Sequence, residues 1–210
     1  LSTTDIQNLT TDQIQALTTA QLVALSSTNI QALSTDQIVA LKTSQVAALS
    51  TANLGALKTD QIQAIETTDI QALTTTQLQG LSTTNIAALT TDQIVALKTS
   101  QIAGLSTTNL GALTTDQIQA IETADVQALT TAQLQGMTTT NIAALTTDQI
   151  RALKTSQIAG LSTANIAALT SDQLGALSSA QAAALTTASF AGLSTTDIQN
   201  LTTDQIQALT

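Results

Sequence analysis

Hydrophobic and polar positions recur with a period of eight residues along the whole chain. Counted from Leu1, each octad has Leu, Ile or Met at its first position (a), Ser or Thr at its third (c) and, with one exception, Gln, Asn or Asp at its fifth (e). The sixth position (f) is Ile, Leu or Val except at Ala182 and Phe190, and the eighth (h) is Ala, Gly or Asn. Because no insertion interrupts the pattern, we expect residues 1–210 to form a single uninterrupted octapeptide-repeat array, a segment of a longer array.

An octad suits neither a continuous helix nor a continuous flat strand. At about 100° per residue a helix would turn the apolar positions a and f by roughly 80° from one octad to the next, so no apolar stripe would persist. In a flat strand, positions a and f would point to opposite faces. The chain must therefore bend once in each octad.

A helix of about six residues in each octad accounts for every recurrent position. The Ser or Thr at the second position (b) can accept a hydrogen bond from the N–H at e, while the side chain at e accepts one from the N–H at b, which is a capping box. Positions a and f then form a hydrophobic staple. Asp at the fourth position (d), as at Asp12, favours a first helical turn, and a small residue at h, such as Gly80, allows a tight helix end.

Some octads carry a charged residue at b that cannot cap through a hydroxyl. We expect these octads to be weaker or capped differently. The residues concerned are Lys42, Lys58, Lys98, Lys154, Glu66 and Glu122.

One octad cannot be stable by itself. Burying one Leu and one Ile contributes roughly 3 to 6 kcal/mol, whereas ordering each of eight residues costs about 1 to 2 kcal/mol of backbone entropy. Each coil of the chain must therefore cover the apolar face of the coil before it. We expect an all-α solenoid of very short helices, one per octad, with three or four octads in a coil. The alternative is a β-solenoid, which the Thr and Ile content also suits.

Two longer periods are superimposed on the octad. The phrase LKTSQ begins at residues 41, 97 and 153, a spacing of 56 residues or seven octads. Residues 1–18 are identical to residues 193–210, a spacing of 192 residues. We interpret the shorter period as a trace of duplication and the longer one as the unit of a larger array.

The composition argues against catalysis. Without Cys or His, the chain lacks the usual ligands of zinc, iron and copper, the commonest general base and the thiolate nucleophile. The acids at position e alternate with Asn and Gln, so a hydrogen-bonding role suffices for them; they are Asp5, Asp69, Asp125 and Asp197. We predict no enzyme activity, cofactor, metal site or small-molecule substrate.

The charge and the apolar runs constrain the partners. A net charge of -9, only 5 basic residues and a single Phe provide neither a basic patch nor an aromatic platform for nucleic acid. The apolar runs are far shorter than the ~20 residues of a membrane span. The chain begins in mid-pattern without a signal-like segment, as an excerpt or a processed product would.

Four residues are candidate special sites. Asn8 and Asn200 fit the N-glycosylation pattern, although Asn at h could equally be a left-handed helix stop. Ala182 has lost the large side chain of position f and Phe190 has gained one. Either the two compensate in volume within one core, or Phe190 contacts a partner.

The octad LTTDQIQA, with its variants TTDQI and TTNIAAL, resembles the octapeptide-repeat tracts of large secreted or surface-displayed bacterial proteins of the adhesin kind. The resemblance covers the whole chain and implies an extracellular or cell-surface location and a spacer or fibre role. The start of each octad is also similar to the LTPEQ-like helix start of TAL-effector repeats. The octad is much shorter and has no base-reading pair, so we do not expect DNA binding.

The sequence therefore predicts a structural protein: an extracellular filament, a sheath or an adhesin stalk. Self-association, end to end or lateral, is expected because the ends of a repeat array expose an apolar cross-section. The alternative is an ice- or surface-binding protein in which Thr at position c forms a flat ladder on a β-solenoid.

Overall fold

The computed structural model describes residues 2–209, and all the regular structure in that range is helical. Each octad forms one helix, from four residues in Thr67–Ile70 to six in Thr3–Asn8. The predicted all-α solenoid of very short helices is confirmed. The β-solenoid alternative is wrong, because residues 2–209 contain no strand.

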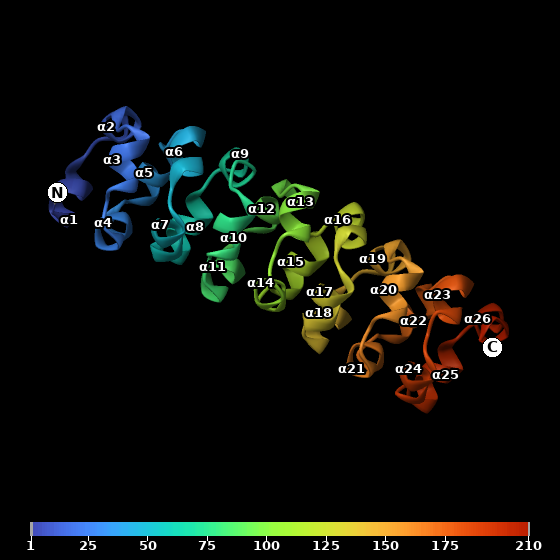
Figure 1. The fold of residues 1–210 in the computed structure, drawn as a ribbon. Helices are drawn as coiled ribbons and strands as arrows, with labels where there is room; N and C mark the ends of the chain where they lie inside the picture. Colours follow the sequence, from blue (N-terminus) through green and yellow to red (C-terminus); the bar gives the residue numbers. More distant parts are fainter. Residues whose placement is uncertain (1, 210) are drawn as a thin grey trace. The chain divides into compact units, whose positions relative to one another are not determined.

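The chain divides into two units, Leu1–Leu105 and Ser106–Thr210 (Figure 1). The helices of the first unit are α1 (Thr3–Asn8), α2 (Thr11–Ala16), α3 (Thr19–Val23), α4 (Ser27–Ala32), α5 (Thr35–Val39), α6 (Thr43–Ala48), α7 (Thr51–Ala56), α8 (Thr59–Ala64), α9 (Thr67–Ile70), α10 (Thr75–Gln79), α11 (Thr83–Ala88), α12 (Thr91–Ala96) and α13 (Thr99–Ala103). Those of the second are α14 (Thr107–Gly111), α15 (Thr115–Ala120), α16 (Thr123–Ala128), α17 (Thr131–Gly136), α18 (Thr139–Ala144), α19 (Thr147–Ala152), α20 (Thr155–Ala159), α21 (Thr163–Ala167), α22 (Ser171–Ala176), α23 (Ser179–Ala183), α24 (Thr187–Ala191), α25 (Thr195–Asn200) and α26 (Thr203–Ala208).

Within each unit, every helix packs on the helix three places further along. In the first unit α1 packs on α4 and α4 on α7, and in the second α14 packs on α17. The bonds between coils join residues 28 and 31 positions apart, as from Gln61 to Leu33 and Ile30, so one coil takes about three and a half octads. The coil size therefore lies between the three and the four octads that the short connections predicted.

The helices start where the capping pattern predicted. At the start of α12 the Thr90 hydroxyl accepts from the Gln93 N–H at 3.1 Å, and the Gln93 side-chain oxygen accepts from the Thr90 N–H at 2.9 Å. The helix ends at Leu97, which is extended (φ -64°, ψ 139°) and whose N–H donates to the Ile94 carbonyl. The residue at a thus ends one helix and precedes the cap of the next.

Octads with a charged residue at b are capped differently, as expected. After Lys42 and Glu66, the N–H at e donates to the backbone carbonyl at b, over 2.8 Å from Gln45 and 3.0 Å from Asp69. After Lys58, the side chain of Asp60 accepts from the Gln61 N–H at 3.0 Å. Backbone and neighbouring carboxylate groups replace the missing hydroxyl.

The staple pairs form the core of each unit. Position f is enclosed, as at Ile62, which is 0% exposed, and position a is nearly so, as at Ile65 with 4%. Among the described residues outside the first and last coils, the same two positions are buried in octad after octad. The core is therefore a continuous column of aliphatic side chains.

The small residues at h have a different role from the predicted one. No described residue has a positive φ, so neither the glycines nor Asn8 and Asn200 act as left-handed helix stops. The extended residue at a ends the helix instead. Glycine at h allows a closer approach between coils: a Cβ added to Gly104 would lie 2.5 Å from Cγ2 of Thr75, one coil earlier.

Candidate functional site: a ladder of side-chain amides

The side chains at position e form a ladder of hydrogen bonds inside each unit. Where the residue at e is Gln or Asn, its amide nitrogen donates to backbone carbonyls of the preceding coil, and in most of these octads its side-chain oxygen also caps its own helix. We call these residues the amide ladder. Its rungs are Gln37, Gln45, Asn53, Gln61, Gln77, Asn85, Gln93 and Gln101 in the first unit and Asn141, Gln149, Gln157, Asn165, Gln173, Gln181 and Gln205 in the second.

Gln61 illustrates a complete rung. Its Oε1 accepts from the Lys58 N–H at 2.8 Å, and its Nε2 donates to the Ile30 and Leu33 carbonyls at 2.9 and 2.7 Å. The residue is 1% exposed. Helix ends leave N–H groups at one terminus and carbonyls at the other without helical partners. One amide therefore satisfies both kinds of group, in two successive coils.

Asparagine makes a shorter rung. Nδ2 of Asn53 donates to the Leu25 carbonyl at 3.1 Å, and that of Asn85 donates to the Leu57 carbonyl at 3.0 Å. A side chain that is one methylene shorter reaches the carbonyl at a, but no bond to the carbonyl at f is formed. Helices α7 and α11, which carry these two residues, lie on the same side of the first unit (Figure 1). That side has fewer bonds between coils.

The sequence interpretation assigned position e to capping alone and missed the ladder. A signal was present in the sequence. Glu is a favoured partner in a capping box, yet no octad has Glu at e. A carboxylate can accept from the N–H at b but cannot donate to a carbonyl of the coil before. Asp does occur at e in four octads, but the strong bias toward Gln and Asn over acids indicated a donor role.

The predicted acids at e occupy two environments. Asp5 is exposed, and its carboxylate accepts from the Ser2 N–H at 2.8 Å; this bond, with a second from the Ser2 hydroxyl, lowers the pKa of Asp5. Asp197 accepts likewise from the Ser194 N–H at 2.9 Å. Asp69 and Asp125 are buried, with 2% and 3% exposure. Within residues 2–209 no group of three or more acids could hold a metal ion.

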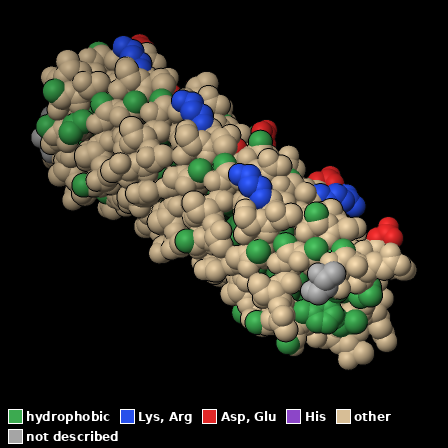
Figure 2. Space-filling view, turned by 45° about the vertical axis from the view of Figure 1, so that its right-hand side comes forward, with side chains coloured by type: hydrophobic (Ala, Val, Ile, Leu, Met, Phe, Trp, Pro, Cys, Tyr) green, Lys and Arg blue, Asp and Glu red, His purple; other side chains and the backbone are tan. Residues whose placement is uncertain are grey.

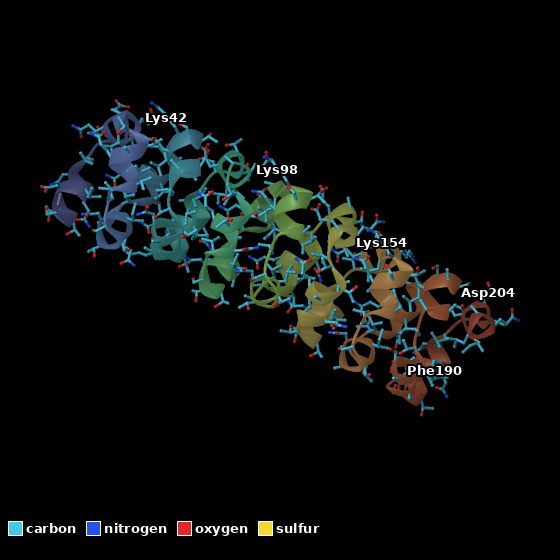
Figure 3. The ribbon with its side chains drawn as sticks, viewed as in Figure 1. Lys42, Lys98, Lys154, Phe190 and Asp204 are labelled. Atoms are coloured by element: carbon cyan, nitrogen blue, oxygen red, sulfur yellow. The ribbon has the colours of Figure 1, made fainter. Side chains whose placement is uncertain are left out.

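Ala182 and Phe190 lie near the end of the second unit. Ala182 is 0% exposed, whereas Phe190 is only half-buried. The ring of Phe190 borders a hollow that is also lined by Leu185 and Leu209. Figure 2 shows hydrophobic side chains gathered at this end of the unit, and Figure 3 places Phe190 there. Whether Phe190 compensates for Ala182 or contacts a partner stays a prediction.

Both predicted glycosylation residues are exposed. Asn8 is the last residue of α1 and Asn200 the last of α25. Nδ2 of Asn200 donates to the Ser171 hydroxyl at 2.9 Å, so a glycan on that nitrogen would have to displace this bond. Glycosylation stays a prediction at both residues.

Charged side chains are sparse on the surface. Lys42 and Lys98, seven octads apart, lie on the same side of the first unit (Figure 3). Among residues 2–209 the one ion pair joins Arg151 to Asp148 at 3.0 Å, with both side chains exposed, and it contributes little to stability. No helix in the described range has the length and apolarity needed to cross a membrane.

Comparison with protein-family models identifies the repeat. The description "ALTTAQ repeat" matches residues 1–27, 11–43, 19–51, 30–64, 62–99, 95–121, 118–155 and 152–187. A comparison with curated proteins finds no match. The matched segments together cover well over half of the chain, which confirms a tandem repeat protein. The chain therefore belongs to the ALTTAQ repeat family.

Proposed function

We propose that this chain is a structural repeat protein, with no enzymatic activity, that builds a filament, a sheath or an adhesin stalk outside the cell. The amide ladder carries the proposal. Because each coil is bonded to the one before by the same contacts, added octads lengthen the array without needing a new kind of interface. The interior of the described residues is occupied by structural bonds and aliphatic side chains, which suits a protein whose role is length and surface coverage.

Exposed core positions in the first and last coils support self-association. Leu9 and Leu17, both at position a, are only half-buried, whereas Leu33 at the same position is 4% exposed. At position f, Ile206 is 42% exposed. The faces of these coils thus present the side chains that elsewhere pack coil on coil. In the 210-residue chain a second copy can cover them, as further octads would in a longer array.

The extracellular location rests on the resemblance to surface-displayed bacterial repeat tracts. We propose the cell surface as the place of action. Surface labelling of intact cells tests this: labelling only after lysis would contradict it.

The ice- or surface-binding alternative is not supported. It required Thr at position c to stand in flat ranks on a β-solenoid, and the short helices of residues 2–209 offer no strand surface for such a ladder. We therefore do not propose it.

The self-association is tested on the 210-residue chain by light scattering coupled to gel filtration over a range of concentrations. We expect the mass to rise with concentration for the wild type and to stay monomeric for Ile206→Glu. Val95→Glu is the matched control, because Val95 is 48% exposed but lies far from both ends of the chain. A wild type that stays monomeric would reject the proposal, and equal loss in both variants would indicate lateral rather than end-to-end contact.

A further inference from the structure

Octad 9, residues 65–72, lacks every bond by which other octads are attached to the coil before them. Its b residue is Glu66, whose side chain makes no cap hydrogen bond, and its e residue is Asp69, which takes the place of a ladder amide. Its helix α9 has four residues, fewer than any other described helix. The octad therefore differs from both neighbours in helix length and in having no ladder amide, and from octad 10 also in lacking a hydroxyl cap.

The register of the ladder shows what Asp69 fails to do. Gln61 donates to carbonyls 31 and 28 residues earlier, at Ile30 and Leu33. The same spacing pairs Asp69 with the carbonyls of Ile38 and Leu41. Asp has no amide N–H to donate, and the Asp69 side chain bonds to neither carbonyl. Asp69 is nevertheless 2% exposed.

The attachment of octad 9 is one-sided. Nε2 of Gln93 donates to the Ile65 carbonyl at 2.7 Å, and Nε2 of Gln101 donates to the Ile70 carbonyl at 3.0 Å. Octad 9 is thus bonded to the following coil, whereas it lies against α6 of the preceding coil without a ladder bond. The octads before and after octad 9 keep their ladder bonds. Gln61 of octad 8 donates to the Leu33 carbonyl, and Gln77 of octad 10 donates to the Leu49 carbonyl, both at 2.7 Å.

We propose that octad 9 is a built-in joint, at which α9 separates from α6 more readily than any other pair of stacked helices in the interior of the first unit. Local opening follows the number of hydrogen bonds and buried contacts that must be lost, and here two ladder bonds and the hydroxyl cap are missing. The same combination recurs in octad 16, with Glu122 at b and buried Asp125 at e, 56 residues later.

Hydrogen exchange of the intact 210-residue chain, followed by mass spectrometry, tests the joint. We expect the amides of residues 66–72 to exchange about tenfold faster than those of residues 74–80 in octad 10. The double variant Glu66→Thr/Asp69→Gln supplies the hydroxyl cap and the amide donor, and it should slow exchange in octad 9 by about the same factor. Asp92→Asn is the control, since it removes one carboxylate at an exposed residue outside the ladder.

A reciprocal variant supplies an independent measurement. Thr74→Glu/Gln77→Asp should convert octad 10 into a second fast-exchanging segment while leaving octad 8 protected. The proposal is overturned if octad 9 of the wild type exchanges as slowly as octad 10, if fast exchange persists in Glu66→Thr/Asp69→Gln, or if octad 10 stays protected in the reciprocal variant. None of these results depends on self-association.

Discussion

The side chain at position e decides how firmly each octad is attached to the coil before it. The Gln side chain has two roles: its oxygen caps its own helix, and its nitrogen donates to two carbonyls of the preceding coil. Gln93, for example, donates to the carbonyls of Ile62 and Ile65. Asn donates to one carbonyl, and Asp to none. A difference of one methylene or one amide group thus sets the number of bonds between coils.

A substitution at Gln61 tests the donor role. Gln61→Glu keeps the oxygen that accepts from the Lys58 N–H but loses the donor to Ile30 and Leu33 and places a carboxylate beside their carbonyls. We expect the free energy of unfolding to fall by about 2 to 4 kcal/mol, measured by urea titration followed by circular dichroism.

Gln13→Glu is the matched control for this prediction. Gln13 has the same capping bonds with Thr10, at 2.8 and 3.2 Å, but it is exposed and donates to no preceding coil among the described residues. Its substitution should change the free energy of unfolding by less than about 0.5 kcal/mol. Equal losses in the two variants would show that capping, and not the ladder, is what Gln61 contributes.

At the scale of helices, the pattern within a single octad predicted where each helix starts and which side chains it buries. The cap at b, the amide or carboxylate at e and the staple between a and f all lie within eight residues, so each helix start could be predicted from its own octad. The role of glycine at h could not. It depends on the Thr at c in the coil before, as between Gly104 and Thr75, and that neighbour is unknown until the number of octads per coil is known.

Two glycine substitutions test this close packing between helices. In Gly104→Ala the new Cβ would meet Thr75 at 2.5 Å, so α13 or α10 must shift. We expect this variant to lose about 1 to 3 kcal/mol of stability. In Gly175→Ala the new Cβ meets nothing within 4 Å, and because Ala favours helix over Gly, a gain of up to about 1 kcal/mol is expected. Thermal unfolding of both variants measures the difference, and a stabilised Gly104→Ala would contradict the packing argument.

At the scale of the molecule, the 56-residue period has a geometric counterpart. Lys42 and Lys98, one such period apart, lie on the same side of the first unit (Figure 3). Seven octads thus return equivalent residues to the same side within this unit. The period therefore places residues of the same type on one side of the unit. The duplication history stays a prediction.

Deleting whole octads should preserve the fold. Removal of residues 33–56 takes out three octads and keeps every remaining rung in register, so helicity per residue should be unchanged while the melting temperature falls. Removal of residues 33–60 shifts the register by half an octad and should lower helicity as well. Far-ultraviolet circular dichroism distinguishes the two, and equal helicity in both deletions would mean that the ladder does not set the register.

The sequence by itself determined the short helix, its cap, its apolar pair and the need to stack, because these depend on residues within one octad and on the entropy that a lone octad cannot offset. It did not determine the number of octads per coil, the bonds from Gln61 to Ile30 and Leu33, or the reason for glycine at h. Those depend on which octad lies beside which. Nearly identical octads could stack in several registers, so only the tertiary structure decided among them.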